Sequence, residues 1–310
     1  MKINNLIIYI LSILSLLTFG GCDEEFLEFY PEDKITSANF PKNEDDIKLQ
    51  LNGVYALLRE NSIYNEGFFG FGVLDGATPN AFNWGNTPIA KAGNGQLSSS
   101  DGQMVTFRWT RSYAIIFRAN NLLKSLEEIE LSDDIKSKYV GEGHFLRGLA
   151  YSILADSYGG VPLVQGALTT EEARTIGRAS LEETWGQAIS DYNIAIENLD
   201  IDAPEVGRAN KGAALAMKMR AYLYQNKYQE ILPVITEIDA LNKYSLYSSY
   251  EGLFKPENEN NSEVIFDIQY IPGENSQGSL HDQFCGTGTG SWTRGSRYVP
   301  TDDLVNAYEM

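Results

Sequence analysis

Residues 142–164 read EGHFLRGLAYSILADSYGGVPLV, and this stretch decides the fold predicted for the chain. Its apolar side chains recur at the spacing that gathers them into one stripe on a helix of 3.6 residues per turn. They are Leu146, Leu149, Ala150, Ile153 and Leu154. Gly159 and Gly160 can close the helix in the left-handed conformation, and Pro162 prevents it from resuming. The stretch therefore predicts a core-facing helix, then a turn and a short extended segment.

Helical patterns of the same kind precede this stretch. Asn43 is placed to cap a first helix, with Asp46 three residues later. The buried face predicted for that helix consists of Ile47, Leu51, Val54, Tyr55 and Leu58. A second helix starts near Met104, and its predicted face consists of Trp109, Tyr113, Ile116, Phe117, Asn120 and Leu123. A further helix from Ser132 or Asp133 continues into residues 142–164, so we expect an antiparallel pair joined by a short polar turn.

Helices also follow it. Ser180 and Glu183 form a capping-box pattern. The helical face predicted beyond it consists of Leu181, Trp185, Ala188, Ile189, Tyr192, Ile196 and Leu199. Two more helices are expected at 211–225 and 228–241, where AALAMKMRAYLYQNKYQEIL resembles a tetratricopeptide helical hairpin. The fold class predicted is mainly α, with tetratricopeptide-like hairpins.

Long loops and a few short strands interrupt these helices. Residues 61–102 and 271–298 are rich in glycine and polar residues, lack a sustained period, and exceed the usual loop length. Loops of this length are usually functional or disordered, and six aromatic rings in the first of them argue against disorder. Residues 263–270 alternate, with Val264, Phe266, Ile268 and Tyr270 on one side, which predicts a strand.

The amino-terminal end has the pattern of an export signal. Lys2 precedes an apolar run over residues 6–19 that has the length of a signal-peptide core and is too short for a membrane span. The run ends at FGGC, residues 19–22, which resembles a lipobox with Cys22 as the lipidated residue. We expect residues 1–21 to be a lipoprotein signal peptide and residues 22–42 to be a tether and extended arm. An ordinary secretory signal with an incidental cysteine is the alternative.

Composition and motifs exclude several classes of function. The 310 residues carry a net charge of −18, whereas a nucleic-acid-binding surface is basic. Only two histidines are present, and neither lies in a metal-ligand or nucleophile motif, so we expect no metal, no cofactor and no catalytic residue. We expect a structural role for His144, which we place at the start of the helix in residues 142–164. Asp101 and Asp75 flank the first loop, either as ordinary turn residues or as hydrogen-bonding groups at a site.

A ligand-binding site is indicated by a set of aromatic rings beside amide groups in the two long loops. A sugar ring presents an apolar C–H face for stacking and a rim of hydroxyls that Asn, Asp and Arg can bind. The candidate ligand-binding residues are Asp75, Asn80, Asn83, Trp84, Asn86, Trp292, Arg294 and Tyr298. The alternative is that the two tryptophans only anchor their loops to the core.

Three motifs together resemble the SusD/RagB family of outer-membrane nutrient-binding lipoproteins. They are the lipobox at Cys22, the segment with FLR at 145–147, Tyr151 and DSYGGVPL at 156–163, and PTDDLVNAYEM at 300–310. The last motif lies near the middle of family members, so we expect residues 43–310 to be a SusD-like helical domain that is incomplete at its carboxyl end. The resemblance also implies that ligand lies on an aromatic arc built from two loops, which by order are those holding Trp84 and Trp292.

The resemblance implies a function without catalysis. A family member captures an oligosaccharide, or less often a peptide, and delivers it to a SusC-like TonB-dependent transporter. It would be anchored by lipid to the outer membrane and face the cell surface. Two other classes remain open: a helical-repeat scaffold that binds protein only, and a glycoside hydrolase, which needs two suitably spaced carboxylates.

Overall fold

The computed structural model describes residues 40–60, 63–64, 75–83, 88–99, 101–166, 168–270 and 298–308. The chain divides into two compact units, Met1–Lys42 and Asn43–Met310. Only residues 40–42 of the first unit are described, so the predicted signal peptide, Cys22 and nearly all of the arm lie outside the described residues. Everything that follows concerns the second unit.

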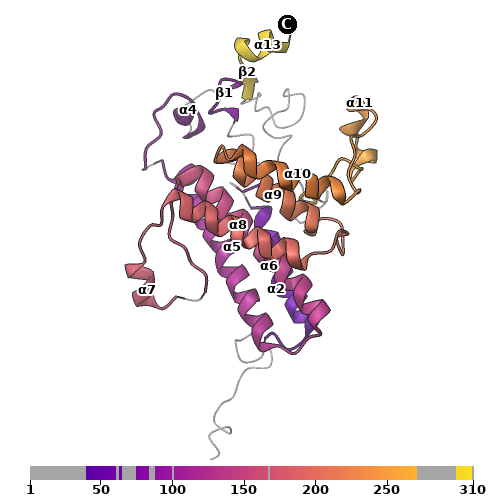
Figure 1. The fold of residues 1–310 in the computed structure, drawn as a ribbon. Coiled ribbons are helices and arrows are strands. Elements are labelled where there is room, and N and C mark those ends of the chain that lie inside the picture. The colour runs from indigo at the N-terminus through magenta and orange to yellow at the C-terminus, as the bar shows by residue number, and fades with distance from the viewer. Residues whose placement is uncertain are drawn as a thin grey trace, which may run out of the picture. The chain divides into compact units, whose positions relative to one another are not determined.

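Three long helices build the centre of this unit (Figure 1): α5 (Gly102–Glu128), α6 (Asp133–Tyr158) and α8 (Leu181–Asn198). Helix α6 runs antiparallel to α5, because the Tyr158 hydroxyl at its end donates to the Val105 carbonyl near the start of α5, at 2.6 Å. It also runs antiparallel to α8, since a Cβ on Gly141 would meet Asn198 at the far end of α8. The predicted helix over residues 142–158 is thus the middle layer of three.

Shorter helices complete the described unit. Packed on the central three are α2 (Glu44–Leu58) and α9 (Lys211–Tyr224), and α9 pairs with α10 (Tyr228–Ala240). The expected hairpin of residues 211–241 is therefore present, with its bounds shifted by one residue at the carboxyl end of each helix. The remaining elements are α4 (Pro88–Gly93), α7 (Thr170–Thr175), α11 (Tyr250–Leu253), the 3₁₀ helix η2 (Pro256–Asn258), α13 (Asp302–Tyr308) and two short strands.

Side-chain caps explain where several helices begin. The Asn43 side chain accepts from the Asp46 amide at 3.0 Å at the start of α2. Ser180 and Glu183 cap each other's backbone at the start of α8, which confirms the predicted capping box. Each such cap satisfies an amide that has no partner within the helix.

The core lies between the central helices and α2. From α6 it takes the whole predicted stripe, and Phe145, Leu146, Ala150 and Leu154 are fully buried. Gly148 permits the close approach of α8, because a Cβ there would lie 2.9 Å from the Tyr192 ring and 3.1 Å from the Ala188 carbonyl oxygen. Apolar burial of this kind is the main stabilising contribution to the fold.

The turn after α6 is also as expected. Gly159 has a φ of 75°, and its amide bonds to the Ala155 carbonyl. The extended segment beyond it is held by side chains of the helices: Tyr113 donates to the Pro162 carbonyl at 2.7 Å, and Asn120 and Tyr151 both donate to the Val164 carbonyl at 2.9 Å. Polar groups placed along α5 and α6 therefore fix a segment that has no partner strand among the residues that the structure describes.

Three expectations were wrong. Phe117 is 60% exposed, because the buried stripe of α5 runs instead through Ile116, Ala119 and Leu122. Leu181 is 48% exposed, since it lies in the first turn of α8 before the helix enters the core. His144 lies in the middle of α6 and not at the start of a helix.

The strand predicted from alternation at 263–270 does not form. Residues 264–270 are all partly buried and pair with no strand in the described part of the chain. Their apolar side chains pack on helices, as where Phe266 meets the Phe145 ring edge-on at 5.2 Å between centroids. The alternating pattern indicated that one side of this segment is covered. Helices provide that cover, and no neighbouring strand is needed to explain the pattern.

Candidate functional site

The two long loops that carry the predicted ligand-binding residues are joined by a small sheet. Strand β1 (Ala81–Asn83) pairs antiparallel with β2 (Tyr298–Pro300). In this register Asn83 is the partner of Tyr298, and Phe82 is the partner of Val299. Two predicted site residues that are far apart in sequence therefore occupy facing positions.

Hydrogen bonds beside the sheet fix the chain next to these strands. The Thr301 amide donates to the Asn80 carbonyl at 3.0 Å, and the Thr301 hydroxyl donates to the Pro79 carbonyl. The same hydroxyl accepts from the Leu304 amide at 3.2 Å and so caps α13. Thr301 thus ties the segment before β1 to the segment after β2.

The approach to β1 is an exposed turn. The Asp75 carbonyl accepts from the Thr78 amide at 3.0 Å and from its hydroxyl at 2.8 Å. The side chains of Asp75 and Asn80 are exposed, and Phe82 is 51% exposed. A polar rim and an aromatic ring therefore face solvent at this end of β1.

Asp101 braces the other end of the first loop. Its carboxylate pairs with Lys91 of α4 and accepts from the Ser98 amide and hydroxyl, each at 2.9 Å. The hydrogen bond from Lys91, followed by those from Ser98, lowers the pKa of Asp101 to about 2. The Asp101 carboxylate therefore stabilises the turn. This is one of the two roles that the sequence left open for it.

The described residues cover half of the predicted site. Asp75, Asn80, Asn83 and Tyr298 lie at or beside the β1–β2 sheet. Trp84, Asn86, Trp292 and Arg294 lie outside the described residues. Their role in ligand binding stays a prediction.

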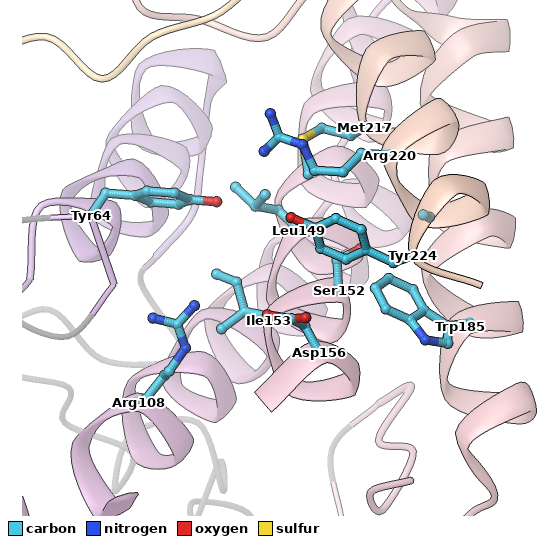
Figure 2. A pocket seen from close by; sticks show the side chains of 11 residues that line it. Tyr64, Arg108, Leu149, Ser152, Ile153, Asp156, Trp185, Met217, Arg220 and Tyr224 are labelled. Atoms are coloured by element: carbon cyan, nitrogen blue, oxygen red, sulfur yellow. The ribbon is translucent and has the colours of Figure 1, made fainter. Parts of the chain in front are cut away.

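A pocket that sequence analysis missed opens between the helices (Figure 2). Side chains from five parts of the chain converge on it, including two arginines, Arg108 of α5 and Arg220 of α9. Tyr64, Asp156 and Tyr224 line it as well. No short motif could have indicated it, because its residues are spread over 160 positions and only the helix packing gathers them.

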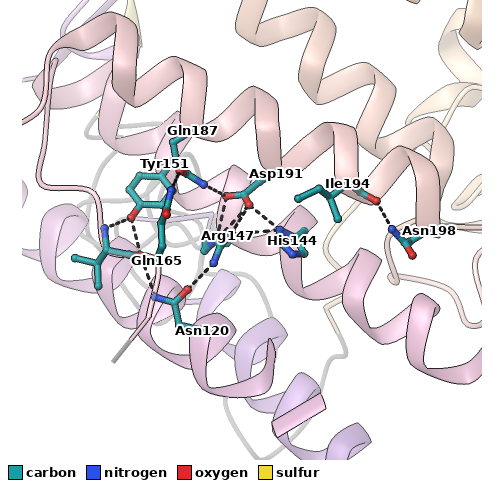
Figure 3. A network of polar contacts seen from close by, with 10 residues as sticks. Asn120, His144, Arg147, Tyr151, Gln165, Gln187, Asp191, Ile194 and Asn198 are labelled. Atoms are coloured by element: carbon teal, nitrogen blue, oxygen red, sulfur yellow. Dashed lines mark hydrogen bonds and ion pairs between the residues drawn. The ribbon is translucent and has the colours of Figure 1, made fainter. Parts of the chain in front are cut away.

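A buried polar network centred on Arg147 was also missed (Figure 3). The Arg147 guanidinium donates to both carboxylate oxygens of Asp191, with a shortest distance of 2.6 Å, and to the Asn120 side-chain oxygen at 2.8 Å. His144 Nδ1 lies 2.7 Å from the same carboxylate, and Gln187 donates to it at 3.0 Å. The FLR triplet at 145–147 was the available signal, since an arginine within an apolar stripe needs a buried partner.

The network holds a charge in the core. Burial alone would raise the pKa of Asp191, but hydrogen bonds from His144 and then Arg147 outweigh it, so that the pKa is lowered. Asp191 is thus ionised and paired with Arg147 although it is fully buried. This centre joins α5, α6 and α8, and the structural role expected for His144 agrees with its position there.

A model of a protein family described as SusD-like, starch-binding and associating with the outer membrane matches residues 25–223. The chain belongs to the SusD-like family. A SusD-like protein of Formosa agariphila is 29% identical over 326 residues, which cover 100% of this chain and 61% of that protein.

Solved SusD-like structures share the fold. A SusD-like carbohydrate-binding protein from Bacteroides fragilis is 28% identical, with a TM-score of 0.74 over 85% of this chain and 52% of its own. A laminarin-binding SusD-like protein is 26% identical, with a TM-score of 0.68 over 83% of this chain and 55% of its own. The SusD-like chain described here thus spans little more than half the length of the relatives it matches.

Two searches of the described residues gave negative results. None of their helices is both long and apolar enough to cross a membrane. No group of three or more His, Cys, Asp or Glu side chains in the described ranges could hold a metal ion.

Proposed function

We propose that this protein binds an oligosaccharide at the β1–β2 sheet and the loops that adjoin it. The observation that carries the proposal is the pairing of Asn83 with Tyr298, which draws together two loops rich in aromatic and amide side chains. Aromatic rings stack on the apolar faces of sugars, and amides and carboxylates bind the hydroxyls. The SusD-like relatives named for carbohydrate or laminarin binding support the same ligand class.

The proposal extends to the protein's place in the cell. The family description of outer-membrane association supports a surface position, with Cys22 as the lipid-bearing residue. There the protein would deliver its oligosaccharide to a SusC-like TonB-dependent transporter. This delivery requires binding only, without catalysis. Co-purification of the transporter with the protein from solubilised outer membranes tests this part.

Isothermal titration of the full-length protein without its signal and Cys22 tests the site. The probes are laminarin, starch and a panel of neutral oligosaccharides, and the variants are Asn80→Ala, Trp84→Ala, Trp292→Ala and Tyr298→Ala. We expect one glycan class to bind and the Tyr298→Ala substitution to raise its Kd by about tenfold or more, because a stacking partner is lost.

Tyr308→Ala is the matched control. Tyr308 is 86% exposed on α13 and lies outside the strand pairing, so its removal should leave the Kd unchanged. If no variant in the two loops weakens glycan binding while each keeps its Tm, the site assignment is wrong. If no glycan binds to the folded protein, the peptide-binding and scaffold alternatives take precedence.

A further inference from the structure

The pocket between α5, α6 and α9 has no residue in common with the β1–β2 sheet. It has two lobes that share Tyr64, Leu149, Met217 and Arg220, with volumes of about 90 and 270 Å³. One water needs only ~10–15 Å³ of such space, so the lobes can take a ligand the size of a sugar unit.

Positive charge converges on this pocket. Arg108 is anchored by its Nε, which donates to the Ser157 hydroxyl at 2.8 Å. Arg220 is exposed, and its guanidinium makes no hydrogen bond or ion pair with any described residue. Figure 2 shows the two side chains on opposite sides of the Tyr64 hydroxyl. Burial raises the pKa of that hydroxyl, and the charges of Arg220 and Arg108 act in the opposite direction, as expected if both guanidiniums lie near it.

The arrangement fits an anion, although the protein as a whole is acidic. The chain has 42 acidic and 24 basic side chains, yet two arginines line this opening, and among the described lining residues the carboxylates are Asp156 and Asp267. Neither of these two carboxylates forms an ion pair with Arg220. A ligand carboxylate would be bound by charge-assisted hydrogen bonds, which are about twice as strong as neutral ones.

The rest of the lining fits a sugar ring. Tyr224 is 54% exposed and is held edge-on by buried Trp185, with ring centroids 6.1 Å apart. Its ring offers a stacking surface, and Leu149 and Met217 provide apolar contact beside it. Asp156 is exposed at the rim and can accept from hydroxyls.

We propose that this pocket is a second binding site, for a sugar unit that carries a carboxylate, as in a uronic-acid oligosaccharide. The carboxylate is bound by Arg220, with the Tyr64 hydroxyl as a further donor and the charge of Arg108 adding to the positive potential, and the ring lies against Tyr224. The site is distinct from the loops of the proposed function and does not depend on them.

Titration of the full-length protein with oligomers of galacturonate, glucuronate, mannuronate and guluronate tests the proposal. Each is compared with the same oligomer after its carboxyl groups are reduced to alcohols, and with succinate as a free dicarboxylate. We expect at least one uronate oligomer to bind, its reduced form to bind at least tenfold more weakly, and succinate to bind no better than the reduced form.

Variants locate the binding. Arg220→Gln should raise the Kd for the uronate oligomer at least tenfold, whereas Lys227→Gln, the same charge change at an exposed residue of the same hairpin, should leave it within twofold. Tyr298→Ala should also leave it unchanged, which separates this site from the β1–β2 sheet. The proposal is overturned if no uronate binds, if the reduced oligomers or succinate bind equally well, or if Lys227→Gln has the effect of Arg220→Gln.

Discussion

At the scale of single residues, the most consequential feature is the ion pair in the core. Arg147 is 7% exposed and Asp191 is fully buried, so both charges have lost nearly all contact with water. Such a pair is stable only when the remaining donors and acceptors are satisfied, as Asn120, His144 and Gln187 do here. The pair therefore specifies how α5, α6 and α8 are arranged, beyond any net contribution to stability.

Arg147→Met should lower the free energy of unfolding at pH 7 by about 3–5 kcal/mol, because the carboxylate of Asp191 stays buried without its partner. The double variant Arg147→Met with Asp191→Leu should recover at least half of that loss. Urea denaturation measures both. Lys138→Gln, which removes exposed pairs with Asp134 and Asp200, is the control and should cost at most about 1 kcal/mol. Equal losses for Arg147→Met and the control would contradict this account.

A second buried carboxylate, that of Glu142, should change the free energy of unfolding with pH in the opposite direction to Asp191. Burial raises the pKa of Glu142, although Arg208, at 3.2 Å, and a hydrogen bond from Tyr55 act against the shift. The folded state therefore holds the Glu142 proton more tightly than the unfolded state does, and stability from this group is lost as the pH rises through its folded pKa.

Glu142→Gln removes that titration. The unfolding free energy of this variant relative to the parent should rise as the pH increases above about 4.5, the usual pKa of a glutamate. Urea denaturation between pH 4 and 8 measures it. A difference that is constant with pH would show that Glu142 titrates equally in both states. Asp191, with its lowered pKa, should reduce stability only when the pH falls below about 4.

At the scale of elements, the contact of α6 with α8 depends on the absence of side chains. Gly148 faces Tyr192 and the backbone of Ala188, whereas Gly186, on α8, has no atom within 4 Å of the position of its missing Cβ. The same substitution at these two glycines should therefore have opposite effects.

Gly148→Ala should destabilise the protein by about 1–3 kcal/mol, because the helices must separate or the Tyr192 ring must move. Gly186→Ala should stabilise it by about 0.5–1 kcal/mol through helix propensity alone. Thermal unfolding of the two variants beside the parent measures both. A Tm for Gly148→Ala at or above that of the parent would show that the interface is looser than its geometry indicates.

The helices could be predicted from sequence because period and capping are local. Asn43, Ser180 and Gly159 act on neighbouring residues, and their effects are as expected. The failures at Phe117 and at residues 263–270 have a different cause, since which neighbour covers a face depends on packing that no local pattern encodes. The same holds for the site: the loops could be selected by composition, but the register of Asn83 with Tyr298 could not.

At the scale of the whole molecule, the described unit has a buried helical centre and, in addition, a small sheet built from its two long loops. The fold is shared with SusD-like proteins of 28% and 26% identity, whose matched region likewise amounts to little more than half of each chain. The net charge of −18 suits the neutral ligands proposed at the sheet, whereas the pocket with its two arginines is the place proposed for an anionic sugar unit. Stability and binding are therefore expected to respond to different substitutions.

The bond from Thr301 to Pro79 joins residues 222 positions apart. Closing so long a loop has a high entropic cost until the intervening helices have shortened the path, and contacts of this range form late in folding. The β1–β2 sheet is therefore expected to assemble after the helical centre, so the proposed oligosaccharide site is complete only once the helices have formed. If the proposed function holds, oligosaccharide binding is a measure of completed folding.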